Sequence, residues 1–284
     1  MLEQSRGERA PAVLADRSAA TETLHRMATV DRYNDWIFRK LGHHLGRRVL
    51  EVGCGTGNMT PYFLGLAGAG ATSGPARGRA GCDLMTCIDV DDESVELVQR
   101  RFAAEPRVHT LHGDICEPET VTRVRELAAG ASAASARAEE PPGYDTITCI
   151  NVLEHIEDDA LALRHMRDVL VPGGKLLLFV PAGMYLFGAL DVAVGHYRRY
   201  TLRPLVELLR GVGYSVDESF YMNAAGIPGW FLSSRILRRS TPPLGLLSLF
   251  NLLAPAFIKF EETFHPSFGQ SIVCVARKPA AHEQ

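Results

Sequence analysis

The sequence predicts an α/β fold in which a mostly parallel sheet carries helices on both faces. Short apolar runs rich in Val, Ile and Leu alternate with amphipathic segments of helical length between residues 48 and 220. Strands that are apolar along their whole length are typical of parallel sheets, because helices bury both of their faces. Of the 284 residues, 46% are hydrophobic and 22% are charged, which excludes collagen-like and wholly disordered chains.

The elements follow one another in a regular order. Seven apolar runs are the expected strands: Arg48–Val52, Leu84–Val90, Val108–Leu111, Tyr144–Asn151, Lys175–Val180, Tyr214–Phe220 and Gln270–Ala276. Four amphipathic segments are the expected helices between them: Asp92–Phe102, Pro118–Leu127, Asp158–Leu170 and Leu202–Val212. A further amphipathic helix is expected to open at Asp31, before the first strand.

Two segments interrupt this order, at residues 67–82 and 128–142. Both are rich in Ala, Gly, Ser and Pro and contain almost no large apolar side chain, so we predict flexible surface insertions. Residues 1–20 are polar and lack the apolar core of an export signal, and we expect a disordered leader there. Residues 21–284 are then one domain, with a further insertion at 221–268 between the last two strands that forms part of the acceptor site or a lid.

Charge and cysteine content restrict the partners and the compartment. The net charge of −3 gives no bulk attraction to nucleic acid, so we expect no nucleic-acid partner. Six cysteines without a CxxC pair predict a reducing, cytoplasmic location and no structural zinc.

The most apolar run, 244–258, is shorter than the roughly 20 residues that span a bilayer. We therefore expect no transmembrane segment. Two readings of 244–258 remain, a lid helix packed on the core and an interfacial helix that makes peripheral membrane contact.

The most informative segment is Val49–Asn58, with the sequence VLEVGCGTGN. Its three glycines, Gly53, Gly55 and Gly57, follow a strand and allow a sharp turn and close approach to a ligand, because no Cβ intervenes. A dinucleotide-binding loop would need a glycine where Asn58 stands, and no Gly-Lys-Ser/Thr follows, which excludes a P-loop.

Together with Glu51 at the strand end, this segment resembles motif I of the class I S-adenosylmethionine-dependent methyltransferases. Three more stretches match that family in order: Asp89 at the end of the second strand, Gly113-Asp114-Ile115 after the third, and Asn151–Ile156 after the fourth. The resemblance implies a Rossmann-like sheet of seven strands with the last one antiparallel. It also implies S-adenosylmethionine as cofactor and S-adenosylhomocysteine as product.

The resemblance gives several residues an expected place around the cofactor. Asp89 corresponds to the carboxylate that accepts both ribose hydroxyls, as its two oxygens allow. Asp114 corresponds to the acid near the adenine amino group, and Tyr33 to an aromatic residue near the sulfonium, where a cation–π contact is favourable. The complete set of expected cofactor-binding residues is Tyr33, Glu51, Gly53, Gly55, Gly57, Asn58, Asp89, Val90, Asp114, Ile115 and Asn151.

Two histidines are candidate bases for the acceptor. His155 follows the fourth strand, although Glu154-His155 also occurs in the family as a feature of the helix start. His196 lies in the segment Asp191–Thr201, DVAVGHYRRYT, and is the preferred base or acceptor-orienting residue. Some quinone O-methyltransferases hold a divalent metal with Glu-x-x-Glu-His at this place; here Asn151 replaces the first Glu, so we expect no metal.

The acceptor is expected to contact aromatic and basic side chains after the fifth strand. Arg199 could bind an acidic acceptor bidentately, or it could pair with Asp191 and serve the fold. The expected substrate-binding residues are Tyr185, Tyr197, Arg199, Tyr200 and Trp230.

These features predict methyl transfer to oxygen or nitrogen of a small-molecule acceptor that is bulky, apolar or acidic. Two alternatives remain open: cyclisation of S-adenosylmethionine to a cyclic amino acid and methylthioadenosine, and a non-catalytic partner subunit that binds S-adenosylmethionine. Both a monomer and a homodimer are compatible with the sequence.

Overall fold

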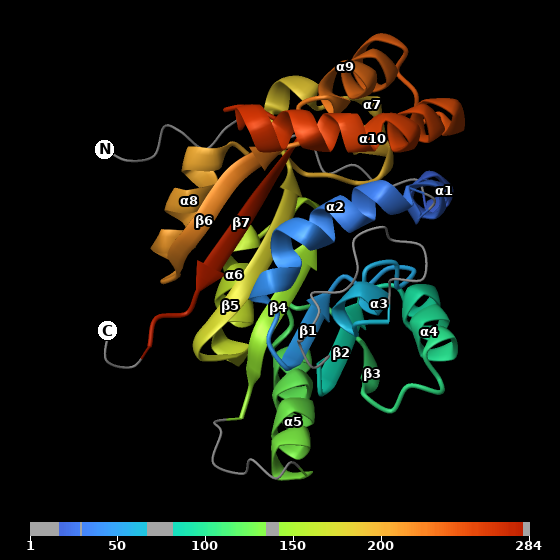
Figure 1. Cartoon of the computed structure of the whole chain (residues 1–284). Helices are drawn as coiled ribbons and strands as arrows, with labels where there is room; N and C mark the ends of the chain where they lie inside the picture. Colours follow the sequence, from blue (N-terminus) through green and yellow to red (C-terminus); the bar gives the residue numbers. More distant parts are fainter. Residues whose placement is uncertain (1–16, 29, 67–81, 135–141, 281–284) are drawn as a thin grey trace.

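One seven-stranded sheet organises the chain in the computed structural model, which describes residues 17–28, 30–66, 82–134 and 142–280 (Figure 1). The strands lie in the order β3-β2-β1-β4-β5-β7-β6. Their bounds are β1 (Arg48–Val52), β2 (Leu84–Asp89), β3 (Val108–His112), β4 (Tyr144–Ile150), β5 (Leu170–Pro181), β6 (Ser215–Met222) and β7 (Ser271–Arg277). Strand β7 is antiparallel to both β5 and β6, while β1 to β5 pair in parallel. The predicted fold class is confirmed, including the antiparallel last strand.

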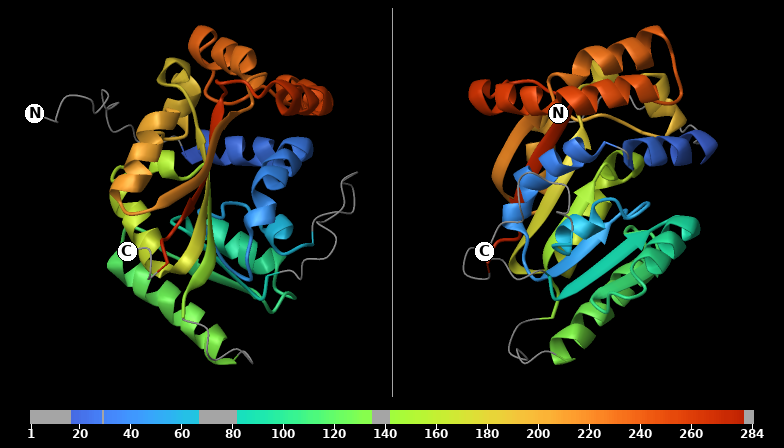
Figure 2. Two further views of the ribbon diagram at one scale, coloured as in Figure 1. Left: turned by 60° about the vertical axis from the view of Figure 1, so that its left-hand side comes forward. Right: turned by 45° about the vertical axis from the view of Figure 1, so that its right-hand side comes forward.

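Helices cover both faces of the sheet (Figures 1 and 2). Successive side chains of β1 point to opposite faces of the sheet, so Val49 and Leu50 belong to different hydrophobic clusters. The Leu50 cluster contains side chains of α5 (Pro118–Ala134), α6 (Asp159–Val169) and α8 (Leu202–Gly211). The Val49 cluster contains side chains of α2 (Asp31–Leu41), α3 (Thr60–Phe63), α4 (Asp92–Arg101) and α10 (Leu244–Phe264).

Short elements complete the description. Helix α1 (Arg17–Ala28) precedes α2, and α7 (Ala189–Ala193) and α9 (Gly226–Trp230) lie at the carboxyl edge of the sheet (Figure 1). Three short 3₁₀ helices are η1 (Gly42–His44), η2 (Leu153–His155) and η3 (Met184–Leu186), and η4 (Phe231–Ile236) is a π-helix. Helices α4 and α6 begin where the side chains of Asp91 and Asp158 accept hydrogen bonds from the backbone N–H three residues on, which is N-capping.

The segments of low complexity differ in part from the prediction. Helix α5 continues to Ala134, so the insertion expected at 128–142 begins with helix, and Ala128 is fully buried because it packs in the core. Helix α1 begins at Arg17, inside the expected leader 1–20. Residues 1–16, 67–81 and 135–141 lie outside the described residues.

Strand β5 begins at Leu170, earlier than the expected Lys175. Tyr144 pairs with Leu170, and Thr146 then pairs with Lys175, so the Pro172-Gly173-Gly174 sequence forms a bulge within the strand. The bulge is bonded to the chain just after β7, since the Gly173 N–H donates to the Lys278 carbonyl at 2.9 Å.

The long insertion at 221–268 folds into α9, η4 and α10 and lies over the carboxyl edge of the sheet (Figure 2). Helix α10 has 21 residues and continues past Ile258, so the helix is longer than the apolar run 244–258. By length and composition alone it could cross a membrane, and only 17% of its most apolar window is buried inside the structure. This corrects the expectation that the segment is too short.

Candidate active site

The glycine loop turns at the end of β1 in a conformation that favours glycine. Gly53, Gly55 and Gly57 have φ angles of +73°, +48° and +72°. The N–H groups of Gly53 and Cys54 both donate to the Ile88 carbonyl, at 2.8 and 3.1 Å, which holds the loop against the end of β2. A Cβ on Gly53 would clash with the Val152 side chain, so the loop and the segment after β4 approach each other at a distance that only glycine permits.

Asp89 ends β2 directly beside this loop. One carboxylate oxygen accepts a hydrogen bond from Gly55 N–H at 2.8 Å, and the other accepts one from Asp91 N–H at 3.0 Å. Burial raises the pKa of Asp89, although these backbone hydrogen bonds oppose the rise. Each oxygen keeps acceptor capacity, which a pair of vicinal hydroxyls requires. Val90, the next residue, is 65% exposed at the same edge.

Glu51 lies behind the loop, with its carboxylate buried. Its Oε2 accepts hydrogen bonds from Thr60 Oγ1 at 2.7 Å and from the Cys87 thiol at 3.6 Å. Burial raises the pKa of Glu51 to about 7. The side chain therefore connects β1 to the start of α3, and Oε2 serves the fold.

The other expected cofactor residues of β3 and β4 lie at the same edge. Asp114 is half-buried, and its Oδ1 accepts from Cys116 N–H at 2.8 Å, while the Ile115 side chain is buried. Asn151 is exposed and has a φ of +53°, and its N–H donates to the Phe179 carbonyl. Asn58 is half-buried in the glycine loop. The structure thus collects these predicted residues at the carboxyl ends of β1 to β4, where open α/β sheets bind ligands.

Tyr33 lies farther along the sheet edge, on α2. Its ring is buried and packs edge-on against Trp36, Phe179 and Phe250, with ring centroids 5.8 to 6.3 Å apart. Its hydroxyl lies 3.4 Å from Ser271 Oγ at the start of β7. Burial raises the pKa of this phenol. In this structure Tyr33 therefore forms part of the aromatic contact between α2, β5 and α10.

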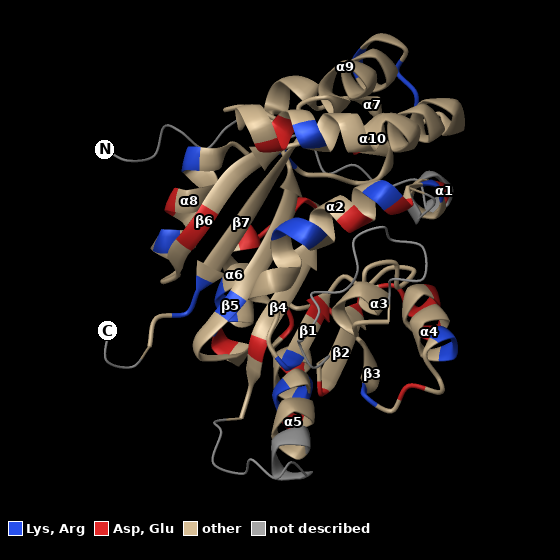
Figure 3. Cartoon of the chain, in the orientation of Figure 1, with Lys and Arg blue, Asp and Glu red and all other residues tan. Residues whose placement is uncertain are grey.

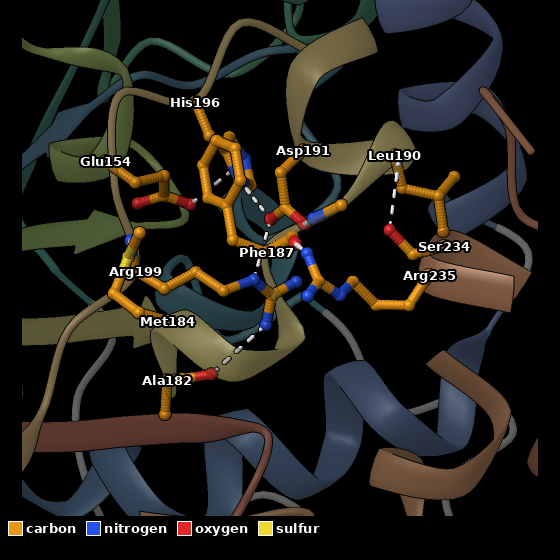
Figure 4. A network of polar contacts seen from close by, with 11 residues as sticks. Glu154, Ala182, Met184, Phe187, Leu190, Asp191, His196, Arg199, Ser234 and Arg235 are labelled. Carbon is orange, nitrogen blue, oxygen red and sulfur yellow. Dashed lines mark hydrogen bonds and ion pairs between the residues drawn. The ribbon is translucent and has the colours of Figure 1, made fainter. Parts of the chain in front are cut away.

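His196 is the centre of a buried polar network (Figure 4). Its Nδ1 lies 2.8 Å from Asp191 Oδ1, and Arg199 Nε donates to the same oxygen at 2.7 Å. The second Asp191 oxygen accepts from Gly188 N–H at 3.0 Å. Burial alone would raise the pKa of Asp191, but the hydrogen bond from His196 and the charge of Arg199 lower it. Asp191 therefore fixes both the His196 ring and the Arg199 guanidinium.

Glu154 faces the other nitrogen of the same ring (Figure 4). Its side chain is fully buried, and its Oε1 lies 3.7 Å from His196 Nε2. Among the described residues no hydrogen-bond donor reaches either carboxylate oxygen. Burial raises the pKa of Glu154 to about 7. Sequence reasoning treated Glu154 as a helix-start residue, because nothing in the local pattern shows that it meets a histidine 42 positions later.

His155 is exposed, and its ring meets that of His196 edge-on at 4.6 Å. Loss of hydration by the charged ring, and then the charge of the neighbouring His196, lower the pKa of His155. Glu154, His155 and His196 each offer one ligand atom, and these atoms lie within 4.8 Å of one another, so the three residues could hold a metal ion. The sequence predicted no metal, because Asn151 stands where the metal-binding enzymes have their first Glu. In the structure His196 joins Glu154 and His155 as the third candidate ligand.

The predicted substrate residues divide into two groups. The Arg199 guanidinium is buried, paired with Asp191, and lies 4.8 Å above the Trp230 ring. The Tyr200 hydroxyl is buried and donates to the Leu153 carbonyl at 3.2 Å. Of the two possibilities for Arg199, the structure shows the pairing with Asp191: Nε donates to Asp191 Oδ1 and Nη1 to the Ala182 carbonyl. Tyr185, at 56% exposed, can meet a ligand from solvent.

Tyr197 and Trp230 are half-buried between these extremes. Arg198, the neighbour of Tyr197, is paired with Asp159 at 2.7 Å, so both arginines of the segment serve ion pairs. All six cysteines are free thiols, and five of them are buried.

Comparison with known proteins defines the family. A family described as methyltransferase domain matches residues 15–219. The chain belongs to this methyltransferase domain family. A ubiquinone biosynthesis O-methyltransferase of Xanthomonas euvesicatoria is 29% identical over 187 residues, which are 61% of this chain and 64% of the relative. The chain thus spans less than two thirds of this curated relative.

Two solved structures have the same fold as this chain. The N-methyltransferase NodS of Bradyrhizobium japonicum, in complex with S-adenosylhomocysteine, aligns with a TM-score of 0.51 at 15% identity, covering 93% of this chain and 95% of NodS. The [4+2]-cyclase SpnF aligns with a TM-score of 0.53 at 17% identity, covering 95% of this chain and 98% of SpnF. At such identities the likeness establishes the fold and leaves the reaction to the site itself.

Proposed function

We propose that the protein transfers the methyl group of S-adenosylmethionine to an oxygen or nitrogen atom of a small-molecule acceptor. One observation carries the proposal: the glycine loop and Asp89 lie at the carboxyl ends of β1 and β2, and His155, just beyond the neighbouring β4, packs against His196 at the same edge of the sheet. When bound, the cofactor supplies a methyl group already activated by the positive charge on its sulfur.

The residues present fit the cofactor. The positive φ angles of Gly53, Gly55 and Gly57 turn the loop sharply at the end of β1, and without Cβ atoms its backbone can approach a ligand closely. The carboxylate of Asp89 is positioned for a vicinal diol by two backbone N–H groups. Asp114 and Ile115 lie in the segment after β3 as a polar and an apolar neighbour, which suits the edge and face of a purine.

The histidine pair offers a neutral imidazole whose ring nitrogen can accept a hydrogen bond from a hydroxyl or amine nucleophile. His155 is the exposed member and is assigned to contact the acceptor. The side chain of His196 is only 9% exposed, so we assign it a positioning role, with Asp191 holding its orientation. The bond to Asp191 uses Nδ1 and leaves Nε2 turned toward Glu154. Methyl transfer is otherwise a problem of alignment, which a rigid sheet edge meets.

The test is a product assay on the purified protein with S-adenosylmethionine. The curated relative is named for ubiquinone biosynthesis, so phenolic acceptors are the first to test, followed by amines. Release of S-adenosylhomocysteine with one added methyl group on the acceptor supports the proposal. Release of methylthioadenosine would support cyclisation instead, and binding without turnover over a broad acceptor panel would support a non-catalytic subunit.

A binding variant tests the cofactor part separately. Asp89→Ala removes both acceptors for the diol, and we expect S-adenosylhomocysteine affinity to fall by at least about tenfold in calorimetric titration. Glu96→Ala is the matched control, because this acidic side chain is 68% exposed on α4 and belongs to no part of the loop. Equal affinities in the two variants would contradict the assignment of Asp89.

A further inference from the structure

The outer face of α10 is apolar and uncovered. Leu249, Leu252, Leu253, Phe260 and Phe264, here called the α10 stripe, are 41% to 68% exposed. Their spacing of three, four and seven or eight residues places them on one side of the helix. Isolated exposed leucines are common on proteins, but a continuous stripe along a 21-residue helix is typical of a contact surface.

The other side of α10 is attached to the body of the protein. Ala254, Ile258 and Glu261 are buried there. The Glu261 carboxylate accepts hydrogen bonds from the N–H groups of Asn223 and Ala224, at 2.9 and 2.6 Å. To span a bilayer, the helix would have to break these contacts and expose a carboxylate to lipid, so in this structure α10 is placed to lie along a surface.

A basic segment lies at the same end of the molecule (Figures 2 and 3). In residues 231–239, here called the arginine segment, four exposed apolar residues alternate with three exposed arginines. They are Phe231, Leu232, Arg235, Ile236, Leu237, Arg238 and Arg239. Within the described ranges no carboxylate pairs with any of the three arginines, although Arg235 also donates to the Phe187 carbonyl. Over most of its length α10 carries no charge, as the tan ribbon in Figure 3 shows.

We propose that the α10 stripe and the arginine segment dock the protein onto an anionic lipid surface. Leu and Phe side chains enter the boundary between headgroups and acyl chains, and the arginines contact lipid phosphates. The attraction must be local, because the net charge of −3 repels an anionic membrane as a whole. A second copy of the chain is the alternative occupant of this surface, and the oligomeric state tests it. This inference does not depend on the proposed methyl transfer.

The test is co-sedimentation of the full chain with vesicles of phosphatidylcholine, with and without phosphatidylglycerol. We expect binding to the vesicles that contain phosphatidylglycerol, and weaker binding at high salt. The double variant Leu252→Glu/Phe260→Glu should lower the partition coefficient by at least about tenfold, because two charges would enter the interface. Arg238→Glu/Arg239→Glu should abolish the preference for the anionic vesicles. Leu66→Glu is the matched control, since Leu66 is 54% exposed beyond α3, and it should bind as the unchanged protein does.

Circular dichroism and the midpoint of thermal unfolding show whether each variant is folded; the substituted side chains are exposed, so neither readout should change. The proposal is overturned if the unchanged protein sediments with neither vesicle, or if the Leu252→Glu/Phe260→Glu variant sediments equally well. It is also overturned if light scattering finds a dimer that this double variant dissociates while vesicles bind neither form.

Discussion

The two halves of the sheet edge are built in different ways. At the ends of β1 and β2 the site is made largely by backbone: positive φ angles, N–H groups and one carboxylate that two N–H groups orient. At the ends of β4 and β5 the site is made by side chains from distant segments, centred on Asp191, His196 and Glu154 (Figure 4). A site built from backbone depends on residues that are contiguous in the sequence, whereas a side-chain network forms only when the folded chain brings distant residues together.

The largest effect is expected where the network is cut. Asp191→Asn keeps the shape of the side chain but leaves the buried Arg199 guanidinium without a charged partner. Breaking one partner of a buried pair costs about 3–5 kcal/mol, so we expect a loss of that order in the free energy of unfolding, measured by urea denaturation. The exposed pair between Arg203 and Glu207 offers a control, since Glu207→Gln should change stability by less than about 1 kcal/mol. A small effect of Asp191→Asn would show that the network contributes little to the fold.

The next effect tests the backbone-built half. Gly53→Ala introduces a Cβ at a φ of +73° and into contact with Val152, so strain and overpacking act together. We expect a loss of about 2–4 kcal/mol in the free energy of unfolding and weaker binding of S-adenosylhomocysteine. Gly211→Ala is the matched control, because a Cβ there meets no atom within 4 Å and should be close to neutral. If the two variants unfold alike, the loop is not constrained as the structure indicates.

A smaller effect concerns the pH dependence of stability behind the glycine loop. Burial raises the pKa of Glu51 to about 7 from its ordinary value of about 4.5, so between these pH values the folded protein keeps a proton that the unfolded chain has released. This proton stabilises the fold fully below about pH 4.5, and its contribution is lost as the pH rises through about 7.

Glu51→Gln removes this dependence. Relative to the unchanged protein without cofactor, the variant should gain about 1–3 kcal/mol between about pH 5 and about pH 8, measured by urea denaturation. Parallel stability curves for the two proteins would contradict the buried environment of Glu51.

The fold could be predicted from the sequence because strands, helices and the glycine loop each depend on residues that are close together in the chain. Strand β1 has the predicted bounds, and β2, β4 and α4 differ from prediction by one residue at their ends. The wrong element bounds occur where contacts between distant residues determine them. Helix α5 extends through an Ala- and Gly-rich stretch because Ala128 is buried in the core. Strand β5 starts early because the Gly173 N–H donates to the Lys278 carbonyl, just after β7. Helix α10 was underestimated because Lys259, Glu261 and Glu262 end the apolar run without ending the helix.

By itself the sequence determined the order of strands and helices, the glycine loop and the family, since each depends on residues that are neighbours along the chain. Only the tertiary structure decided that Arg199 is paired with Asp191, that Glu154 lies buried beside His196, and that α10 leaves one face uncovered. Charge pairing and exposure depend on which distant side chains meet, and a local pattern of residue types does not contain that information.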